Sequence, residues 1–237
     1  MEESHWRERA GSFGAAADVY DRSRPSYPVE AVRWLLPVGA ARVLDLGAGT
    51  GRLTSLLLDL GLDVVAVEPL ANMRAYIPAR AEVLAGSAEQ LPLPDASVDA
   101  VLVGQAFHWF DPELALPEVA RVLRPGGTFG VLWNVKDEVA DWVRELHQLV
   151  GWPERGVGAS APFDAQSGLG APVHQQFTHV QSLEPDLLVD LVASTSALLT
   201  MPADERVVLL ERVLALAPAD GPFQLPYRTE AWRSVRA

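Results

Sequence analysis

The sequence predicts an α/β protein in which a mostly parallel sheet is covered by helices on both faces. From residue 41 onward, short apolar runs rich in β-branched residues alternate with segments of helical spacing. The run at 43–46 ends in a glycine-rich turn at 47–51, and the next run, 63–67, ends in a carboxylate, Glu68. At 237 residues the chain is long enough to bury a substantial core in one α/β domain.

Residues 1–40 are expected to form a helical lead-in that stands outside the sheet. The stretch 12–20 is rich in alanine, and the segment 22–28, which holds two prolines, interrupts it. A second helix is predicted over 29–36, because a proline and then a glycine follow it.

The middle of the chain alternates predicted strands and helices, which is typical of a parallel sheet. One helix has a defined start, because Asp111 is suited to cap it and Pro112 suits its first position. The predicted strands are 41–47, 63–68, 81–86, 98–105 and 128–134, and the predicted helices are 50–60, near 70–79 and 112–123.

The last third of the chain changes character but is expected to join the same sheet. Residues 151–172 are rich in Gly, Ala, Ser and Pro, which predicts a loop. Pro226 suggests that the closing strand lies at an edge or begins near this residue. The elements expected here are strands at 175–183 and 223–235, with helices at 185–199 and 203–217 between them.

Composition narrows the classes of function. The chain has 19 Lys and Arg against 31 Asp and Glu, and it lacks the basic clusters that neutralise phosphates, so a nucleic-acid partner is disfavoured. With no cysteine, disulfides and thiolate metal sites are impossible. No apolar run approaches the roughly 20 residues of a membrane span, and the charged N-terminus is unlike a signal peptide. We therefore expect a cytoplasmic protein that is not bound to a membrane.

No metal site is expected either. His174 and His179 flank a strand-like run, and no carboxylate is expected to accompany them.

The glycine turn and Glu68 together predict a nucleoside site. Glycines let the backbone approach a ligand where a Cβ would collide. Nineteen residues after Gly49, Glu68 ends the next strand, where a carboxylate is placed to accept both hydroxyls of a ribose.

Two ligand classes use this arrangement, dinucleotides and S-adenosylmethionine. A dinucleotide turn has a third glycine where this chain has Arg52. The carboxylate of Asp45 repels a pyrophosphate but suits the ammonium of an amino-acid moiety. The turn therefore favours S-adenosylmethionine, and a dinucleotide-dependent oxidoreductase is the alternative.

With these residues in view, most of the chain resembles the class I S-adenosylmethionine-dependent methyltransferases. Residues 43–51, Val-Leu-Asp-Leu-Gly-Ala-Gly-Thr-Gly, match the family's first motif, and Val-Glu-Pro at 67–69 matches its acidic second. Residues 85–95 look like its adenine-side segment, and Leu-Arg-Pro-Gly-Gly at 123–127 resembles the turn before its fifth strand. Four motifs in the family's order and spacing make a specific match.

The resemblance also points to one branch of this family and implies the fold of the chain. Residues 13–28 and 105–111 resemble the small-molecule branch that includes trans-aconitate methyltransferase-like proteins. The family has a Rossmann-like, doubly wound sheet of seven strands, mostly parallel with an antiparallel last strand. We predict a single domain over 1–237, in which residues 1–40 form a lid over the cofactor and helices within 185–217 cover the acceptor.

The cofactor-binding residues follow from the same motifs. The glycines would line the methionine and ribose, Glu68 the ribose hydroxyls, and Pro69 and Met73 the adenine. Many relatives have Asp where Ser87 stands, so Glu89 can take over the adenine amino group. An arginine fork suits the methionine carboxylate. The full set is Tyr20, Arg24, Asp45, Gly47, Ala48, Gly49, Thr50, Gly51, Glu68, Pro69, Met73, Ser87, Ala88, Glu89 and Gln105.

Catalysis in such a fold is expected to be mostly positional, because the sulfonium is already a good leaving system. His108 is the candidate general base for an acceptor that must lose a proton, since an imidazole titrates near neutrality. His108, Trp109 and Trp133 are the predicted acceptor-binding residues. A protein that binds the cofactor without transferring the methyl group is the non-enzymatic alternative.

Overall fold

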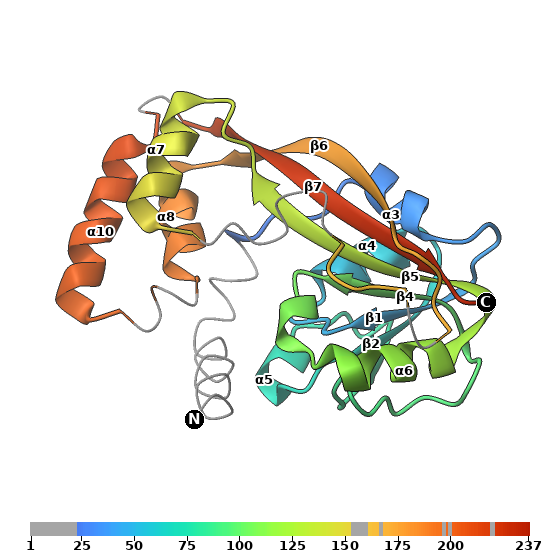
Figure 1. Cartoon of the computed structure of the whole chain (residues 1–237). Coiled ribbons are helices and arrows are strands. Elements are labelled where there is room, and N and C mark those ends of the chain that lie inside the picture. Colours follow the sequence, from blue (N-terminus) through green and yellow to red (C-terminus); the bar gives the residue numbers. More distant parts are fainter. Residues whose placement is uncertain (1–22, 153–160, 166–167, 196–197, 199–200, 219–220) are drawn as a thin grey trace. The chain divides into compact units, whose positions relative to one another are not determined.

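The computed structural model describes residues 23–152, 161–165, 168–195, 198, 201–218 and 221–237. Their strands form one seven-stranded sheet in the order β3-β2-β1-β4-β5-β7-β6, with helices on both sides of its parallel part (Figure 1). The strands are β1 Arg42–Leu46, β2 Asp63–Val67, β3 Glu82–Leu84, β4 Val98–Gly104, β5 Leu123–Lys136, β6 Val173–Leu183 and β7 Phe223–Val235.

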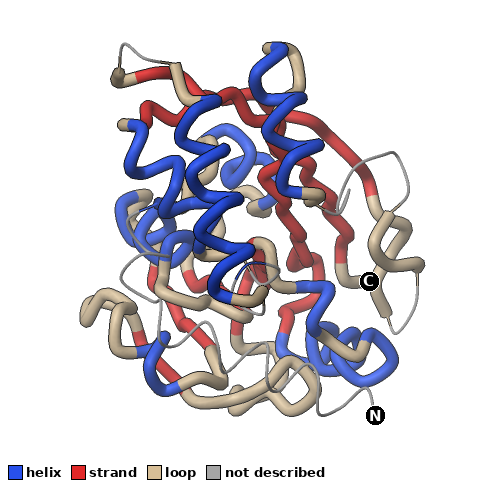
Figure 2. Tube along the Cα trace, turned by 90° about the vertical axis from the view of Figure 1, so that its left-hand side faces the viewer, coloured by secondary structure: helices blue, strands red, loops and turns tan. Residues whose placement is uncertain are grey.

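Along the chain, α3 precedes β1 and the other helices connect one strand to the next, as the alternating pattern predicts. Figure 2 distinguishes the helices and strands by colour. None of those in the described part of the chain is long and apolar enough to cross a membrane. They are α3 Val29–Leu35, α4 Arg52–Asp59, α5 Ala71–Arg74, η1 Phe107–Trp109, α6 Pro112–Val122, α7 Asp141–Val150, α8 Pro185–Ala193 and α10 Ala203–Leu216.

The order of the sheet places a topological switch point at the carboxyl ends of β1 and β4. The chain moves outward from β1 through β2 to β3 and then returns to place β4 on the other side of β1. The connections that follow β1 and β4 therefore diverge, and in open parallel sheets a ligand binds where they do so. β1 pairs in parallel with both neighbours, with Leu44 opposite Val65 of β2 and Val101 of β4.

The chain groups into two compact units. The sheet unit comprises Ser26–Asn134, Gly156–Phe177 and Thr229–Ala237, and the helical unit comprises Met1–Pro25, Val135–Arg155 and Thr178–Arg228. Each unit is built from several segments that are not consecutive in sequence, and the strands β5, β6 and β7 each have residues in both units. The single domain over 1–237 stays a prediction.

Each unit has its own hydrophobic core. In the sheet unit, α3 and α4 pack their apolar residues on one face of β1 and β4, and α6 lies on the other face (Figure 1). In the helical unit, α7, α8 and α10 pack around Leu146, Leu188 and Val213. The helix α3 is therefore part of the core of the sheet unit. Residues 1–22 lie outside the described part of the chain, so the lid predicted over residues 1–40 stays a prediction.

Three elements differ from the sequence-based expectation. The helix expected near 70–79 ends after α5, because the chain turns ahead of Pro78, which has no N–H to continue it. β5 begins before the expected turn at 124–127, which a register shift between Val98 and Ala100 of β4 accommodates. The helix α7 was not expected.

The position of Pro226 also differs in part from expectation. β7 lies between β5 and β6, so the inference of an edge strand is wrong, although Pro226 is near the start of β7. Its missing N–H is tolerated because its carbonyl still accepts a hydrogen bond from the Asp137 amide, at 2.9 Å.

Candidate functional site

The glycine turn after β1 combines close packing on one side with open space on the other. Gly47 has φ +71°, and a Cβ there would lie 2.7 Å from the Cβ of Ala106. Gly49 has φ +57°, yet a Cβ there would meet no atom within 4 Å. The first glycine therefore lets the turn pack against the segment after β4, and the second leaves a left-handed backbone facing room for a ligand.

Glu68 links this turn to the end of β2. It is only 6% exposed, and its two carboxylate oxygens accept hydrogen bonds from the Gly49 and Leu70 amides, both at 2.9 Å. Burial raises its pKa, against the effect of these amides and of Arg74. Arg74 also donates to the Glu68 backbone carbonyl at 2.7 Å, so the backbone of Glu68 is held as well as its side chain.

Two further polar groups lie buried beneath the turn. Asp45 accepts a hydrogen bond from the Thr54 hydroxyl at 2.5 Å, and burial raises the pKa of its carboxyl to about 7, with a smaller contribution from Glu68. Thr50 is 3% exposed, and its hydroxyl has no hydrogen-bond partner among the described residues. An unsatisfied buried hydroxyl beside an open glycine fits a polar ligand such as the predicted cofactor.

The predicted adenine-side residues follow the carboxyl ends of β2 and β3. Met73 in α5 and Ala88 after β3 are both buried apolar residues, whereas Pro69 is exposed. Ser87 forms an isolated bridge with Gln90, and the Glu89 carboxylate accepts a hydrogen bond from the Asp111 amide at 3.1 Å. Since β2 pairs in parallel with β1 and β3 pairs in parallel with β2, the segments that follow these strands lie at the same edge of the sheet as the glycine turn.

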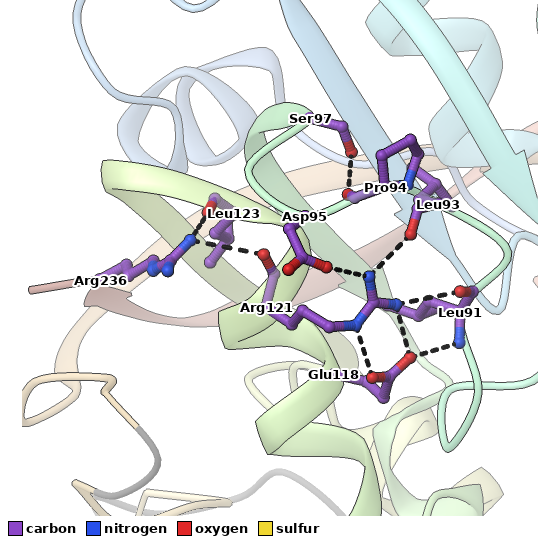
Figure 3. A network of polar contacts seen from close by, with 9 residues as sticks. All are labelled: Leu91, Leu93, Pro94, Asp95, Ser97, Glu118, Arg121, Leu123 and Arg236. Atoms are coloured by element: carbon purple, nitrogen blue, oxygen red, sulfur yellow. Dashed lines mark hydrogen bonds and ion pairs between the residues drawn. The ribbon is translucent and has the colours of Figure 1, made fainter.

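Arg121 of α6 binds residues 91–95, the end of the adenine-side segment, through a network of polar contacts (Figure 3). Arg121 donates to the carbonyls of Leu91 and Leu93 at 3.1 and 2.8 Å, and it pairs with Asp95 at 2.8 Å and with Glu118 at 2.7 Å. Glu118 in turn accepts from the Leu91 amide at 2.8 Å, and Arg121 lowers the pKa of this carboxyl. Arg236 adds bonds to the carbonyls of Arg121 and Leu123. This network fixes the loop after Glu89, and sequence reasoning did not identify it.

The candidate residues after β4 and in β5 differ in how far they are buried. Gln105, at φ +59°, is tied to β5, since its amide donates to Leu132 and its side chain to the Asn134 carbonyl at 3.0 Å. Trp133 is 5% exposed and its indole N–H has no partner in the described part of the chain. His108 in η1 is exposed and lies against Trp109, with ring centroids 4.7 Å apart. Asp111 caps α6 as expected, accepting from the Glu113 amide at 3.0 Å.

The N-terminal candidates are Tyr20 and Arg24. Tyr20 is outside the described residues. Arg24 belongs to the helical unit, where it donates to the Ser194 carbonyl at 3.3 Å. Their role at a methionine carboxylate stays a prediction.

One expectation about the histidines is wrong. His174 does have a carboxylate partner, because its Nε2 lies 2.6 Å from an oxygen of the fully buried Glu230. Gln176 donates to the other oxygen at 2.7 Å, and His174 stacks on Trp232. The two partners are 56 residues apart in sequence and meet only because β6 lies beside β7. Among the described residues no cluster of three acidic or histidine side chains suits a metal ion.

Comparisons with known proteins agree with this geometry. A family model described as a methyltransferase domain matches residues 44–131. An uncharacterized methyltransferase of Mycobacterium tuberculosis is 48% identical over 98% of both chains, and one of Schizosaccharomyces pombe is 31% identical over 79% of both. A solved structure from Anaeromyxobacter dehalogenans, described as a candidate type II methyltransferase, has a TM-score of 0.68 and 26% identity, covering 90% of this chain and 97% of that one.

Proposed function

This chain belongs to the class I S-adenosylmethionine-dependent methyltransferases, and from that premise we propose that it methylates a small molecule, using the glycine turn and Glu68 to bind the donor. The observation that carries the binding site is the Glu68 carboxylate, which is buried, hydrogen-bonded to the Gly49 amide and set beside a turn with open space. The formal net charge of −12 argues against a nucleic-acid acceptor.

The residues at the carboxyl edge of the sheet fit the parts of the donor. Glu68 would accept the ribose hydroxyls. The Thr50 hydroxyl, which has no partner among the described residues, and the buried Asp45 would serve the amino-acid part. Met73 and Ala88 would pack on the adenine, with Ser87 and Glu89 at its edge. When bound, S-adenosylmethionine supplies a methyl group activated by its sulfonium.

The chain's own contribution to the reaction would be orientation and exclusion of water. Holding the acceptor atom in line with the methyl group supplies much of the rate in a bimolecular transfer. The aromatic residues after β4 and in β5 are the candidates for this role, Trp133 as a buried wall and Trp109 beside His108.

Calorimetric titration with S-adenosylmethionine, S-adenosylhomocysteine and NADH tests the donor site. We expect the first two to bind and NADH to give no heat. Glu68→Gln removes the charge that receives the ribose hydroxyls, so the Kd of S-adenosylhomocysteine should rise by roughly 10- to 100-fold, the range of one or two charge-assisted hydrogen bonds. The matched control is Glu82→Gln on β3, which removes a half-exposed carboxylate paired with Arg42 and should leave the Kd unchanged. Tight binding of NADH alone would overturn the proposal.

His108 has a separate test. Its exposed position after β4 suits a base that exchanges protons with solvent, so His108→Ala should lower turnover roughly 100-fold for an acceptor that must lose a proton, while the Kd of the donor stays the same. Initial rates with a hydroxyl acceptor and with a carboxylate acceptor distinguish the two cases. Equal turnover of His108→Ala and the wild type on the hydroxyl acceptor would remove His108 as the base.

A further inference from the structure

Gln105, the first residue after β4, has a backbone conformation that glutamine rarely adopts. Its φ is +59°, in the left-handed region where a Cβ lies too close to the following carbonyl oxygen. Glycine adopts this region at little cost, yet the glycine of this segment, Gly104, stands one position earlier, at the end of β4. A strained residue persists only where its surroundings hold it, and such residues cluster at ligand sites.

Contacts with β5 hold Gln105 in this conformation. Its amide donates to the Leu132 carbonyl at 2.9 Å, and its side chain donates to the Asn134 carbonyl at 3.0 Å. Asn134 is itself fixed, because its side chain accepts from the Thr229 hydroxyl at 2.6 Å and donates to the Ser26 carbonyl at 2.9 Å. The anchor of Gln105 therefore extends to β7 and to the segment before α3, all within the sheet unit.

The residue before Gln105 is equally confined. A Cβ at Gly104 would lie 2.5 Å from the hydroxyl oxygen of Tyr27, so the backbone at the end of β4 packs directly against that side chain. The direction of the chain beyond β4 is therefore set by the left-handed turn at Gln105.

Beyond Gln105 the chain packs on the glycine turn. A Cβ at Gly47 would lie 2.7 Å from the Cβ of Ala106 and 3.3 Å from the Phe110 ring, so these two side chains occupy the space that Gly47 leaves free. The segment 106–110 also carries His108 and Trp109, which are candidates for contact with the acceptor. Gln105 thus directs a segment that touches the predicted donor turn and holds predicted acceptor residues.

Ala96 is the other non-glycine residue with a positive φ in the described part of the chain, at +48°. It is exposed in the loop before β4, where its amide donates to the Arg121 carbonyl at 2.9 Å. Because β4 is parallel to β1, this loop lies at the edge of the sheet opposite to the glycine turn. Ala96 and Gln105 therefore separate the effect of backbone strain from the effect of its place in the fold.

We propose that Gln105 is a positioning residue of the methyl transfer, whose strained backbone holds the segment 106–110 against the glycine turn. The inference rests on the proposed function for the reaction that it serves, whereas the contact between the two segments is measurable in the free protein. Without the side-chain anchor on β5 the strain is no longer compensated, and the segment moves away from Gly47. The turn then loses the packing that holds its shape.

Gln105→Met tests the anchor, because methionine has a similar length, no charge and no N–H for the Asn134 carbonyl. Hydrogen exchange in the free protein reports on both sides of the contact, through the amides of Gly47 and Trp109. We expect both amides to exchange roughly tenfold faster in the variant, the equivalent of one lost hydrogen bond. Unaltered exchange at Gly47 contradicts the proposal, since the segment would then not hold the turn.

Donor affinity is the functional readout. In Gln105→Met the Kd of S-adenosylhomocysteine, measured by calorimetry, should rise roughly tenfold. Gln105→Gly adopts the left-handed backbone without strain but has no anchor, so its urea midpoint should exceed that of Gln105→Met while its Kd stays as high. A residue with a purely structural role would recover stability and affinity together. A wild-type Kd in either variant overturns the proposal.

Ala96→Gly is the matched control. It relieves the same kind of strain at the other end of β4, so it should raise the urea midpoint and leave the Kd of S-adenosylhomocysteine unchanged. A raised Kd in this variant as well contradicts a specific role of Gln105. If S-adenosylhomocysteine does not bind to the wild type, the donor site of the proposed function has failed, and the exchange at Gly47 still decides whether Gln105 holds the turn.

Discussion

At the scale of single residues, Asp45 makes the stability of the folded protein depend on pH. Its carboxyl is 1% exposed and its folded pKa, about 7, is above the ordinary value of 3.8. The folded state therefore holds an extra proton between these two values. The stability that this proton contributes is complete below pH 3.8 and is lost as the pH rises through 7.

Asp45→Asn should remove this dependence. The amide oxygen can still accept from the Thr54 hydroxyl, while no charge has to be buried above pH 7. We expect the variant to be more stable than the wild type at pH 8 by about 1–3 kcal/mol and to show no gain at pH 4. Urea unfolding at both pH values measures the difference. Asp59→Asn, an exposed partner of Arg80, is the control, and a variant that is less stable at pH 8 would show that burial does not oppose ionisation of Asp45.

At the scale of elements, the Arg121 network fixes the loop between β3 and β4. One side chain satisfies two loop carbonyls and two carboxylates, so its loss leaves several partly buried polar groups unpaired at once. The loop follows Glu89 directly, which makes its position relevant to the adenine side of the site.

Arg121→Met should therefore lower both stability and donor affinity. We expect a loss of about 1–3 kcal/mol in the free energy of unfolding and weaker binding of S-adenosylhomocysteine, with faster hydrogen exchange at the Leu91 amide. Chemical denaturation, calorimetry and exchange mass spectrometry provide the three readouts. Arg80→Met removes an exposed ion pair with Asp59 and should change none of them. Unaltered exchange at Leu91 in the Arg121 variant would show that the loop is held by other contacts.

Elements were predictable where local chemistry defines them. The strands of the parallel sheet are continuous apolar runs because they are buried on both faces, and the Asp111-Pro112 pair marks the start of α6. The helix α7 was not predicted because its N-cap residue, Ala140, has no side chain that could cap the helix and mark its start. Its signals are the spacing of Val143, Leu146 and Val150 and the left-handed Gly151 that ends it.

At the scale of the whole molecule, the sequence does not reveal which residues far apart in the chain contact one another in the fold. The resemblance to the family predicted a seven-stranded, mostly parallel sheet, and the motifs predicted the turn with Glu68, because each motif is local and its place in the fold is shared. The contact of His174 with Glu230 depends on the alignment of β6 with β7, which no short segment encodes.

If the proposed donor binds at the glycine turn, the two buried acids Asp45 and Glu68 would make the donor and the spent product unequal ligands. A sulfonium carries a positive charge that the thioether left after methyl transfer lacks, and ionised carboxylates nearby would favour that charge. As Asp45 ionises above pH 7, the difference between the two affinities should widen. The same burial that makes the turn costly to fold would thus help the enzyme to discharge its product and take up fresh donor in alkaline conditions.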